Sequence, residues 1–193
     1  MKLYRGKQKG FTLIELLVAI PIAGLVVAAA TGAIIQLLNV NDISAQNMAI
    51  RQVQTAGSWM SRDGVQTQSA SGISTVGTGI PFTLQWTFWD DTAVPPLVNE
   101  THQVTYSLVD MSSGSRQQLE RREVVTNAVG AVTSDTTIIV AQYVDGSAAY
   151  CRWEADPSSP TGFSQTTFAL TVTATVGSET ESRTYQVRPR SLV

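Results

Sequence analysis

Cysteine, histidine and charged side chains are all scarce in this chain of 193 residues. Its single cysteine cannot form an intramolecular disulfide or supply a zinc site built from several thiolates. Its single histidine excludes histidine-rich metal sites and argues against a catalytic triad. Only 15% of the residues are charged and the formal net charge is −2, so nothing indicates a nucleic-acid-binding protein. The length allows one domain, or one domain with an appendage.

The basic residues that are present gather at the start of the chain. Lys2, Arg5, Lys7 and Lys9 lie within the first ten residues, where no acidic residue occurs. The rest of the chain has no lysine, and its nine arginines stand against 15 acidic residues, a net charge of −6. Residues 1–10 are therefore predicted to be a segment with a separate role.

A long uncharged stretch follows this basic segment. No charged residue lies between Glu15 and Asp42, and Thr31 and Gln36 have the only polar side chains in the 23 residues 16–38. A helix of that length spans a hydrocarbon core of about 30 Å. The positive-inside rule places residues 1–10 in the cytoplasm and everything after about residue 40 outside it. The sequence thus predicts a single span, surrounded by the lipids of the inner membrane.

Two residues of this stretch are unusual for a membrane helix. Glu15 lies at its cytoplasmic edge, where a charge costs less than the roughly 2.5–3.5 kcal/mol expected at the membrane centre. It either lies among the headgroups or has a specific cationic partner. Pro21 removes a helical hydrogen bond and clashes with the carbonyl of Leu17, which predicts a bend.

Residues 10–20, GFTLIELLVAI, preceded by a short basic leader, resemble the N-terminus of type IV prepilins and type II secretion pseudopilins. The resemblance implies that a prepilin peptidase cuts after Gly10 and that the new N-terminal residue, Phe11, is N-methylated. It also implies that Glu15 serves assembly and that other pilin or pseudopilin subunits bind the N-terminal helix. Pro21 departs from the pattern, because the family more often has a small or aliphatic residue there.

Electrostatics is consistent with these implied roles. Cleavage would create an ammonium at Phe11, at the same depth as Glu15. Either charge is costly when it is unpaired in apolar surroundings. An ammonium of one subunit that meets the carboxylate of the next is neutralised only in the correct axial register.

After residue 40 the pattern becomes amphipathic. Ile43, Ile50, Val53, Gly57 and Met60 follow an a/d-like spacing, so we expect one helix over about 11–62 with a stripe to bury against a sheet. Trp59 is interpreted as a packing residue. Alternating patterns predict strands at 81–89, 103–109, 116–126, 136–144, 148–154, 165–176 and 181–188, with loops at 66–79 and 91–101. One helix followed by short strands indicates an α+β fold with an antiparallel sheet.

This organisation has four parts. A cytoplasmic leader at 1–10 is removed, a hydrophobic transmembrane or filament-core helix covers 11–40, an amphipathic continuation covers 41–63, and an exported β-rich domain covers 64–193.

The remaining candidate residues give little support for a catalytic, metal-binding or nucleic-acid-binding site. Cys151 and His102 could form a nucleophile pair, but a small strand residue and a loop imidazole explain them more simply. Asp90 and Asp91 could hold calcium, although two carboxylates fall short of a coordination shell. The arginines Arg116, Arg121 and Arg122 alternate with glutamates and are expected on a solvated strand face. We therefore predict no catalytic residue, no metal, no cofactor, no nucleic-acid partner and no small-molecule substrate.

The favoured function is a structural subunit, and not an enzyme. The hairpin from Val104 to Arg121 loosely resembles J-type minor pseudopilins and W-type minor pilins, and the lack of a cysteine pair also favours a minor subunit. Three alternatives remain open. The chain could be a single-span anchored surface protein with a binding role, a secreted domain with a signal peptide cut after Ala30, or a competence pseudopilin for DNA uptake.

Overall fold

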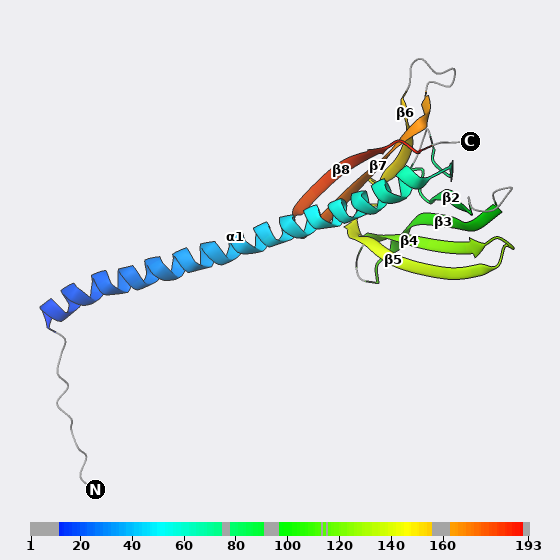
Figure 1. Ribbon diagram of the computed structural model, residues 1–193. Helices are drawn as coiled ribbons and strands as arrows, with labels where there is room; N and C mark the ends of the chain where they lie inside the picture. The colour runs from blue at the N-terminus through cyan, green and yellow to red at the C-terminus, as the bar shows by residue number, and fades with distance from the viewer. Residues whose placement is uncertain are drawn as a thin grey trace, which may run out of the picture. The chain divides into compact units, whose positions relative to one another are not determined.

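The structure is a computed structural model that describes residues 12–74, 78–90, 97–112, 114, 116–155 and 163–190. Within these residues one helix, α1 (Leu13–Gln66), precedes eight strands (Figure 1). The strands are β1 (Ser69–Ser71), β2 (Phe82–Asp90), β3 (Leu97–Asp110), β4 (Gln117–Asn127), β5 (Val132–Val144), β6 (Tyr150–Ala155), β7 (Phe163–Val176) and β8 (Glu179–Val187). The expected α+β fold, a long N-terminal helix with an antiparallel sheet, is confirmed.

The strands form one curled sheet in the order β1-β2-β3-β4-β5-β7-β6, with β8 paired to β7. Strands β1 to β5 follow one another as hairpins, and every pairing of the named strands is antiparallel. The step from β5 to β7 rests on a single pair, Val144 with Ala174. This narrow junction divides the sheet into a β1–β5 part and a β6–β8 part (Figure 1).

The chain divides into two compact units, Met1–Ile43 and Ser44–Val193. The second unit contains the hydrophobic core, where the C-terminal part of α1 lies on the sheet. Val53, Ala56 and Met60 of the helix are fully buried, and Phe82 and Tyr106 of the sheet stack with ring centroids 5.0 Å apart. The apolar stripe of the helix was predicted to pack against a sheet, and it does so in the structure.

Two glycines let β8 approach the helix closely. A Cβ at Gly57 would lie 2.1–2.5 Å from ring atoms of Tyr185, and a Cβ at Gly64 would lie 2.3 Å from a methyl of Val187. Real Cβ atoms do not come so near, so these positions need glycine for space. The two contacts are seven residues apart on the helix and two apart on the strand, which fixes how β8 lies across α1.

The buried stripe differs from the predicted one in two respects. Ile43 is 57% exposed, because burial on the sheet begins only at Ala49. Gln52, which is not part of the predicted stripe, turns towards the sheet, where its Oε1 accepts a 2.8 Å hydrogen bond from the Gln142 amide. The helix also runs to Gln66 instead of 62, and the Thr67 hydroxyl then donates to the Asp63 carbonyl at 2.9 Å.

Both segments predicted to be loops contain strand. Within 66–79, β1 pairs with β2, and the Gln68 side-chain amide makes two hydrogen bonds to the backbone of Thr87, as a neighbouring strand would. Within 91–101, β3 begins at Leu97 and pairs Glu100 with Phe88. Strand β5 starts at Val132, before the predicted 136, because the Asn127 side chain closes a tight turn by accepting from the amides of Val129 and Ala131. In these places strand pairing outweighs polar composition.

Candidate functional site

The candidate site is the start of α1, within the unit that ends at Ile43. Of the predicted site residues, Gly10 and Phe11 lie outside the described residues, and Glu15 lies in the first turn of the helix. Thr12 precedes the first helical residue and so takes the N-cap position.

Thr12 and Glu15 form a reciprocal capping box. The Thr12 amide donates to Glu15 Oε2 at 2.8 Å, and the Thr12 hydroxyl donates to the same oxygen at 2.9 Å. The Glu15 amide in turn lies 3.4 Å from the Thr12 hydroxyl oxygen. A helix start leaves its first amides without intrahelical partners, and this arrangement satisfies two of them.

Sequence reasoning assigned Glu15 to assembly and missed the cap. The signal was present, since threonine followed three residues later by glutamate, just before an apolar run, is the capping-box pattern. The cap gives Glu15 a local partner, and it holds the carboxylate against the amide and hydroxyl of Thr12. The Oε2 oxygen of Glu15 accepts both hydrogen bonds from Thr12.

The surface of this helical segment is apolar and uncovered. From Thr12 to Ile43 every residue except Gly32 is exposed, including Leu13 at 82% and Leu25 at 72%. Length and composition make α1 able to cross a membrane, and none of its most apolar stretch is buried. In water such a surface would be costly, so it needs lipid or another helix against it.

Polar and small residues of the segment suit an apolar environment. The Thr31 hydroxyl donates to the Val27 carbonyl at 2.9 Å, so the helix itself satisfies that side chain. In the described part of the chain, a Cβ at Gly24 or Gly32 would meet no atom within 4 Å. Small residues of this kind permit close helix–helix approach. The helix continues through Pro21, and the predicted bend stays a prediction.

The second unit contains an ionic cluster that sequence reasoning misjudged. Arg121, expected on a solvated face, has a side chain only 6% exposed, and its Nε and Nη2 donate to the two Asp63 oxygens at 2.7 and 3.0 Å. The Tyr106 hydroxyl donates to Asp63 Oδ2 at 2.6 Å. Arg121 was expected in solvent because its partner, Asp63, lies on α1, 58 residues earlier in the chain. No residue pattern along β4 itself reveals that partner.

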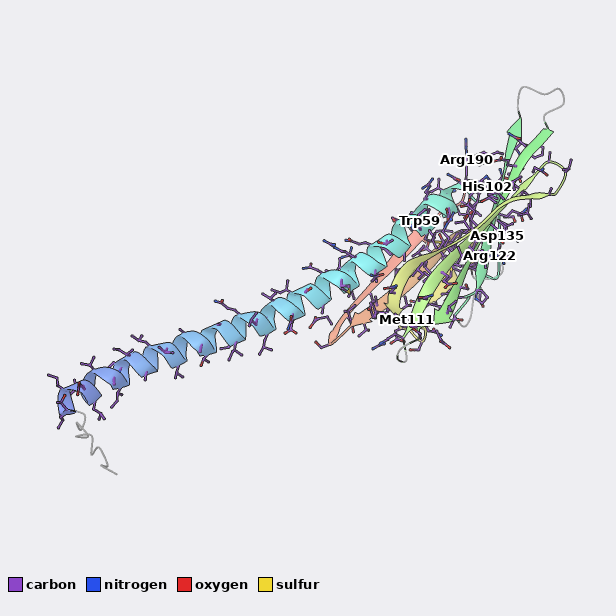
Figure 2. The ribbon with its side chains drawn as sticks, turned by 90° about the horizontal axis from the view of Figure 1, so that it is seen from below. Trp59, His102, Met111, Arg122, Asp135 and Arg190 are labelled. Carbon is purple, nitrogen blue, oxygen red and sulfur yellow. The ribbon has the colours of Figure 1, made fainter. Side chains whose placement is uncertain are left out.

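Trp59 and Glu123 complete this cluster. The Arg121 guanidinium carbon lies 4.8 Å from the Trp59 ring centroid, and its Nη1 donates to Glu123 at 2.9 Å. Trp59, beside the sheet in Figure 2, is thus a packing residue with a cationic neighbour. Burial, with the Asp63 carboxylate, raises the pKa of Tyr106. Burial also opposes the charge of Arg121, but its bonds to Asp63 and Glu123 raise its pKa.

His102 extends the cluster towards the end of the sheet. Its Nδ1 donates to Glu123 Oε1 at 2.8 Å, and its ring stacks on Trp86 with centroids 5.3 Å apart. Burial acts on Glu123 to raise its pKa, but the hydrogen bonds from His102 and Arg121 together lower it. The imidazole is therefore a hydrogen-bond donor inside a strand-to-strand network, on β3 and not in the loop expected from the sequence.

The other candidate residues have structural surroundings. Cys151 is fully buried, and burial raises the pKa of its thiol, which disfavours the reactive thiolate. Asp90 ends β2, and Asp91 lies outside the described residues. Arg122 makes a two-point pair with Asp135, and Arg116 lies 3.3 Å from Asp145, so these two arginines lie on exposed surface as predicted.

Comparison with known proteins gives one finding. Residues 5–31 match the prokaryotic N-terminal methylation motif, which is the cleavage-and-methylation signature of prepilins and pseudopilins. No curated protein and no solved structure matches the chain. The match includes Thr12, Glu15 and most of the uncovered apolar segment, so sequence motif and exposed helix coincide.

Proposed function

We propose that this type IV pilin- or pseudopilin-like precursor is a minor structural subunit of a type IV pilus or a type II secretion pseudopilus. The motif implies processing by a prepilin peptidase and assembly with other pilins. The apolar N-terminal helix fits a membrane-anchored pilin. In the proposed role the protein is not an enzyme; its globular domain is exported, and its helix passes from the membrane into a filament.

The uncovered helix is the observation that carries this proposal. Thr12–Ile43 exposes large apolar side chains on every side, and the same residues overlap the methylation motif. A plain anchor needs only lipid around such a helix. In a filament subunit, the same apolar surface contacts lipid before assembly and neighbouring helices after it. The small residues Gly24 and Gly32 favour such helix–helix contact.

Cleavage between Gly10 and Phe11 is the first step of the proposed life cycle. It removes all four basic residues of the leader and leaves an ammonium one residue before the Thr12 cap. In this proposal Phe11 is then N-methylated, which keeps the nitrogen basic. Mass spectrometry of the protein from its host is expected to find Phe11 at the N-terminus with one added methyl group. A terminus at Thr31 would support a secretory signal, and an uncut chain would support a plain anchor.

In the proposed assembly step, Glu15 pairs with the Phe11 ammonium of a neighbouring subunit. The capping box holds the carboxylate at the helix start, and the neighbour's ammonium neutralises it in one axial register. Removing one partner of a buried pair costs roughly 3–5 kcal/mol, a factor of about 10² to several thousand in an equilibrium. A cap alone is worth about 0.5–2 kcal/mol.

Two substitutions separate the charge from the cap. Glu15→Gln keeps a side chain that can complete a capping box but removes the charge. Thr12→Val removes the capping hydroxyl but keeps the carboxylate. We expect Glu15→Gln, like Glu15→Ala, to reach the inner membrane at wild-type levels and to be depleted from filaments by at least about tenfold. Thr12→Val should remain in both pools.

The measurement pairs cell fractionation, for the membrane pool, with shearing, for the filament pool. Wild-type amounts of Glu15→Gln in the sheared fraction would exclude the charge-pairing role. Equal depletion of Thr12→Val and Glu15→Gln would show that helix capping alone governs assembly. If the wild-type chain itself never enters a sheared fraction, it is an anchored domain with a pilin-like start.

A further inference from the structure

His102 is held between two carboxylates. Its Nδ1 lies 2.8 Å from Glu123 Oε1 on β4, and its Nε2 lies 3.6 Å from Glu100 Oε2 on its own strand, β3. The imidazole, labelled in Figure 2, is 16% exposed, whereas the Glu100 side chain is 47% exposed. The chain contains no other histidine, and imidazole is the side chain that ordinarily changes charge between pH 5 and 8.

Neither neutral form of the imidazole suits this place. With the proton on Nδ1, the ring donates to Glu123, but Nε2 becomes an acceptor that is buried and has no hydrogen-bond donor among the described residues. The carboxylate that Nε2 faces, that of Glu100, is another acceptor. With the proton on Nε2 instead, the lone pair of Nδ1 would face the Glu123 carboxylate at 2.8 Å. Only the imidazolium, which donates from both nitrogens, matches both neighbours.

The aromatic neighbours of His102 also favour the charged ring. Trp86 stacks on the imidazole with ring centroids 5.3 Å apart and planes 9° apart, and Phe88 meets it nearly at a right angle with centroids 5.2 Å apart. A cation within about 6 Å of a tryptophan face is attracted by the ring. Phe88 pairs with Glu100 where β2 ends and β3 begins, so the contacts of His102 reach that end of the sheet.

The charges beside His102 favour one more cation. Glu123 accepts from Arg121 as well as from His102, and Arg121 binds Asp63 on α1. Three carboxylates, those of Glu100, Glu123 and Asp63, thus share one guanidinium. The hydrogen bonds from His102 and Arg121 hold the pKa of Glu123 below its ordinary value, so this carboxylate stays charged at neutral pH.

The other elements at this place add no charge within the part of the chain that the structure describes. Strand β2 contributes the rings of Trp86 and Phe88, which do not titrate, and β5 places Thr136 opposite Glu123. The Tyr106 hydroxyl donates to Asp63, and burial raises its pKa, so it stays neutral.

We propose that His102 is a pH-sensitive clamp on the end of the sheet where β2 ends and β3 begins. Its imidazolium joins Glu100 to Glu123 and, through Arg121 and Asp63, to α1. As the pH rises and the ring loses its proton, the bond to Glu100 is lost and this end of the sheet opens more often. In acid the clamp weakens again, because Glu123 is protonated as the pH falls below 4.5 through its lower folded value. The inference does not depend on the proposed function.

Hydrogen–deuterium exchange of the full-length chain in phosphatidylcholine nanodiscs tests the clamp. The protection of residues 97–101, corrected for the intrinsic pH dependence of amide exchange, is compared at about pH 5.5 and about pH 8. We expect protection to be about two- to fivefold lower at the higher pH, the size typical of an ion pair with a half-exposed partner. The turn at Met111, at the other end of the β3–β4 hairpin, should not respond.

Matched variants assign the response. His102→Gln keeps a side-chain donor for Glu123 but cannot take up a proton, and Glu100→Gln removes the second carboxylate. Both variants should lose the difference between the two pH values. Glu120→Gln removes the same charge from the opposite face of β4 and should respond like wild type. Selective ¹⁵N labelling of histidine, in a chain with a histidine-free tag, should show both ring nitrogens of His102 protonated at the lower pH.

Four results would overturn the proposal. Equal wild-type protection of residues 97–101 at both pH values would mean that no clamp operates. An undiminished response in His102→Gln would assign it to another group. A parallel change at Met111 would indicate a global effect of pH instead of local release. A ring of His102 that is still neutral at the lower pH would remove the imidazolium on which the clamp depends.

Discussion

The two parts of α1 have the same backbone structure and opposite surroundings. Up to Ile43 the side chains are exposed and apolar on every face, with no charge between Glu15 and Asp42. From Ala49 onward one stripe is buried on the sheet, and most of the exposed side chains are polar. A uniformly apolar helix must find partners outside its own chain, whereas an amphipathic helix finds them within it. The apolar part of the helix therefore needs partners outside the chain, whereas the amphipathic part contributes to the folding of the globular unit.

The largest expected effect breaks the buried side of this comparison. Asp63→Ala leaves the Arg121 guanidinium buried with only Glu123 beside it and removes the acceptor of the Tyr106 hydroxyl. We expect a loss of about 3 kcal/mol in the free energy of unfolding of a fragment comprising residues 41–193, followed by chemical denaturation.

The control for this experiment is the exposed pair. Asp135→Ala removes the partner of Arg122, and both of those side chains are about half exposed. Its cost should be under about 1 kcal/mol, because water screens an exposed pair. Equal losses for the two variants would show that burial of the Asp63 pair contributes nothing.

A middle-sized effect compares glycines on the two parts of the helix. Gly57→Ala places a Cβ inside the Tyr185 ring, so despite the better helix propensity of alanine it should destabilise the globular unit by roughly 1–3 kcal/mol. The Cβ of Gly24→Ala would meet no atom within 4 Å among the residues that the structure describes, so this variant should leave that unit unchanged. Limited proteolysis of membrane vesicles that contain each full-length variant reports both outcomes. Faster cleavage of Gly24→Ala would mean that the apolar segment supports the fold.

The smallest effect concerns pH. The pKa of Glu123 is below its ordinary value of 4.5, since the bonds from His102 and Arg121 outweigh its burial. Its contribution to stability is therefore complete above pH 4.5 and is lost as the pH falls through the lower folded value. Glu123→Gln should reduce stability at neutral pH and flatten the pH dependence in that acidic window. Denaturation of residues 41–193 at several pH values measures this, and parallel wild-type and variant curves would contradict it.

Local patterns predicted the elements of the fold well and their ends less well. The helix and each of the seven alternating segments were found, because periodicity within a segment reports which face is buried. Strand β1 was missed because polar residues there pair through backbone and amide groups, as Gln68 does with Thr87. The start of β3 at Leu97 was missed because the two prolines just before it in the sequence favour a loop. Arg121 was misplaced for a related reason, because its partner Asp63 belongs to a different element.

The sequence by itself determined the N-terminal motif and the apolar helix of this protein. A basic N-terminal segment, a motif over residues 5–31 and a long uncharged apolar run are local and contiguous, so they can be recognised without knowing which distant segments meet. Even the capping box of Thr12 and Glu15 spans only four residues. Only the tertiary structure decided that Gly57 lies against Tyr185 and that Asp63 pairs with Arg121. Those features depend on which distant segments meet, and close packing fixes that choice through contacts that no local pattern contains.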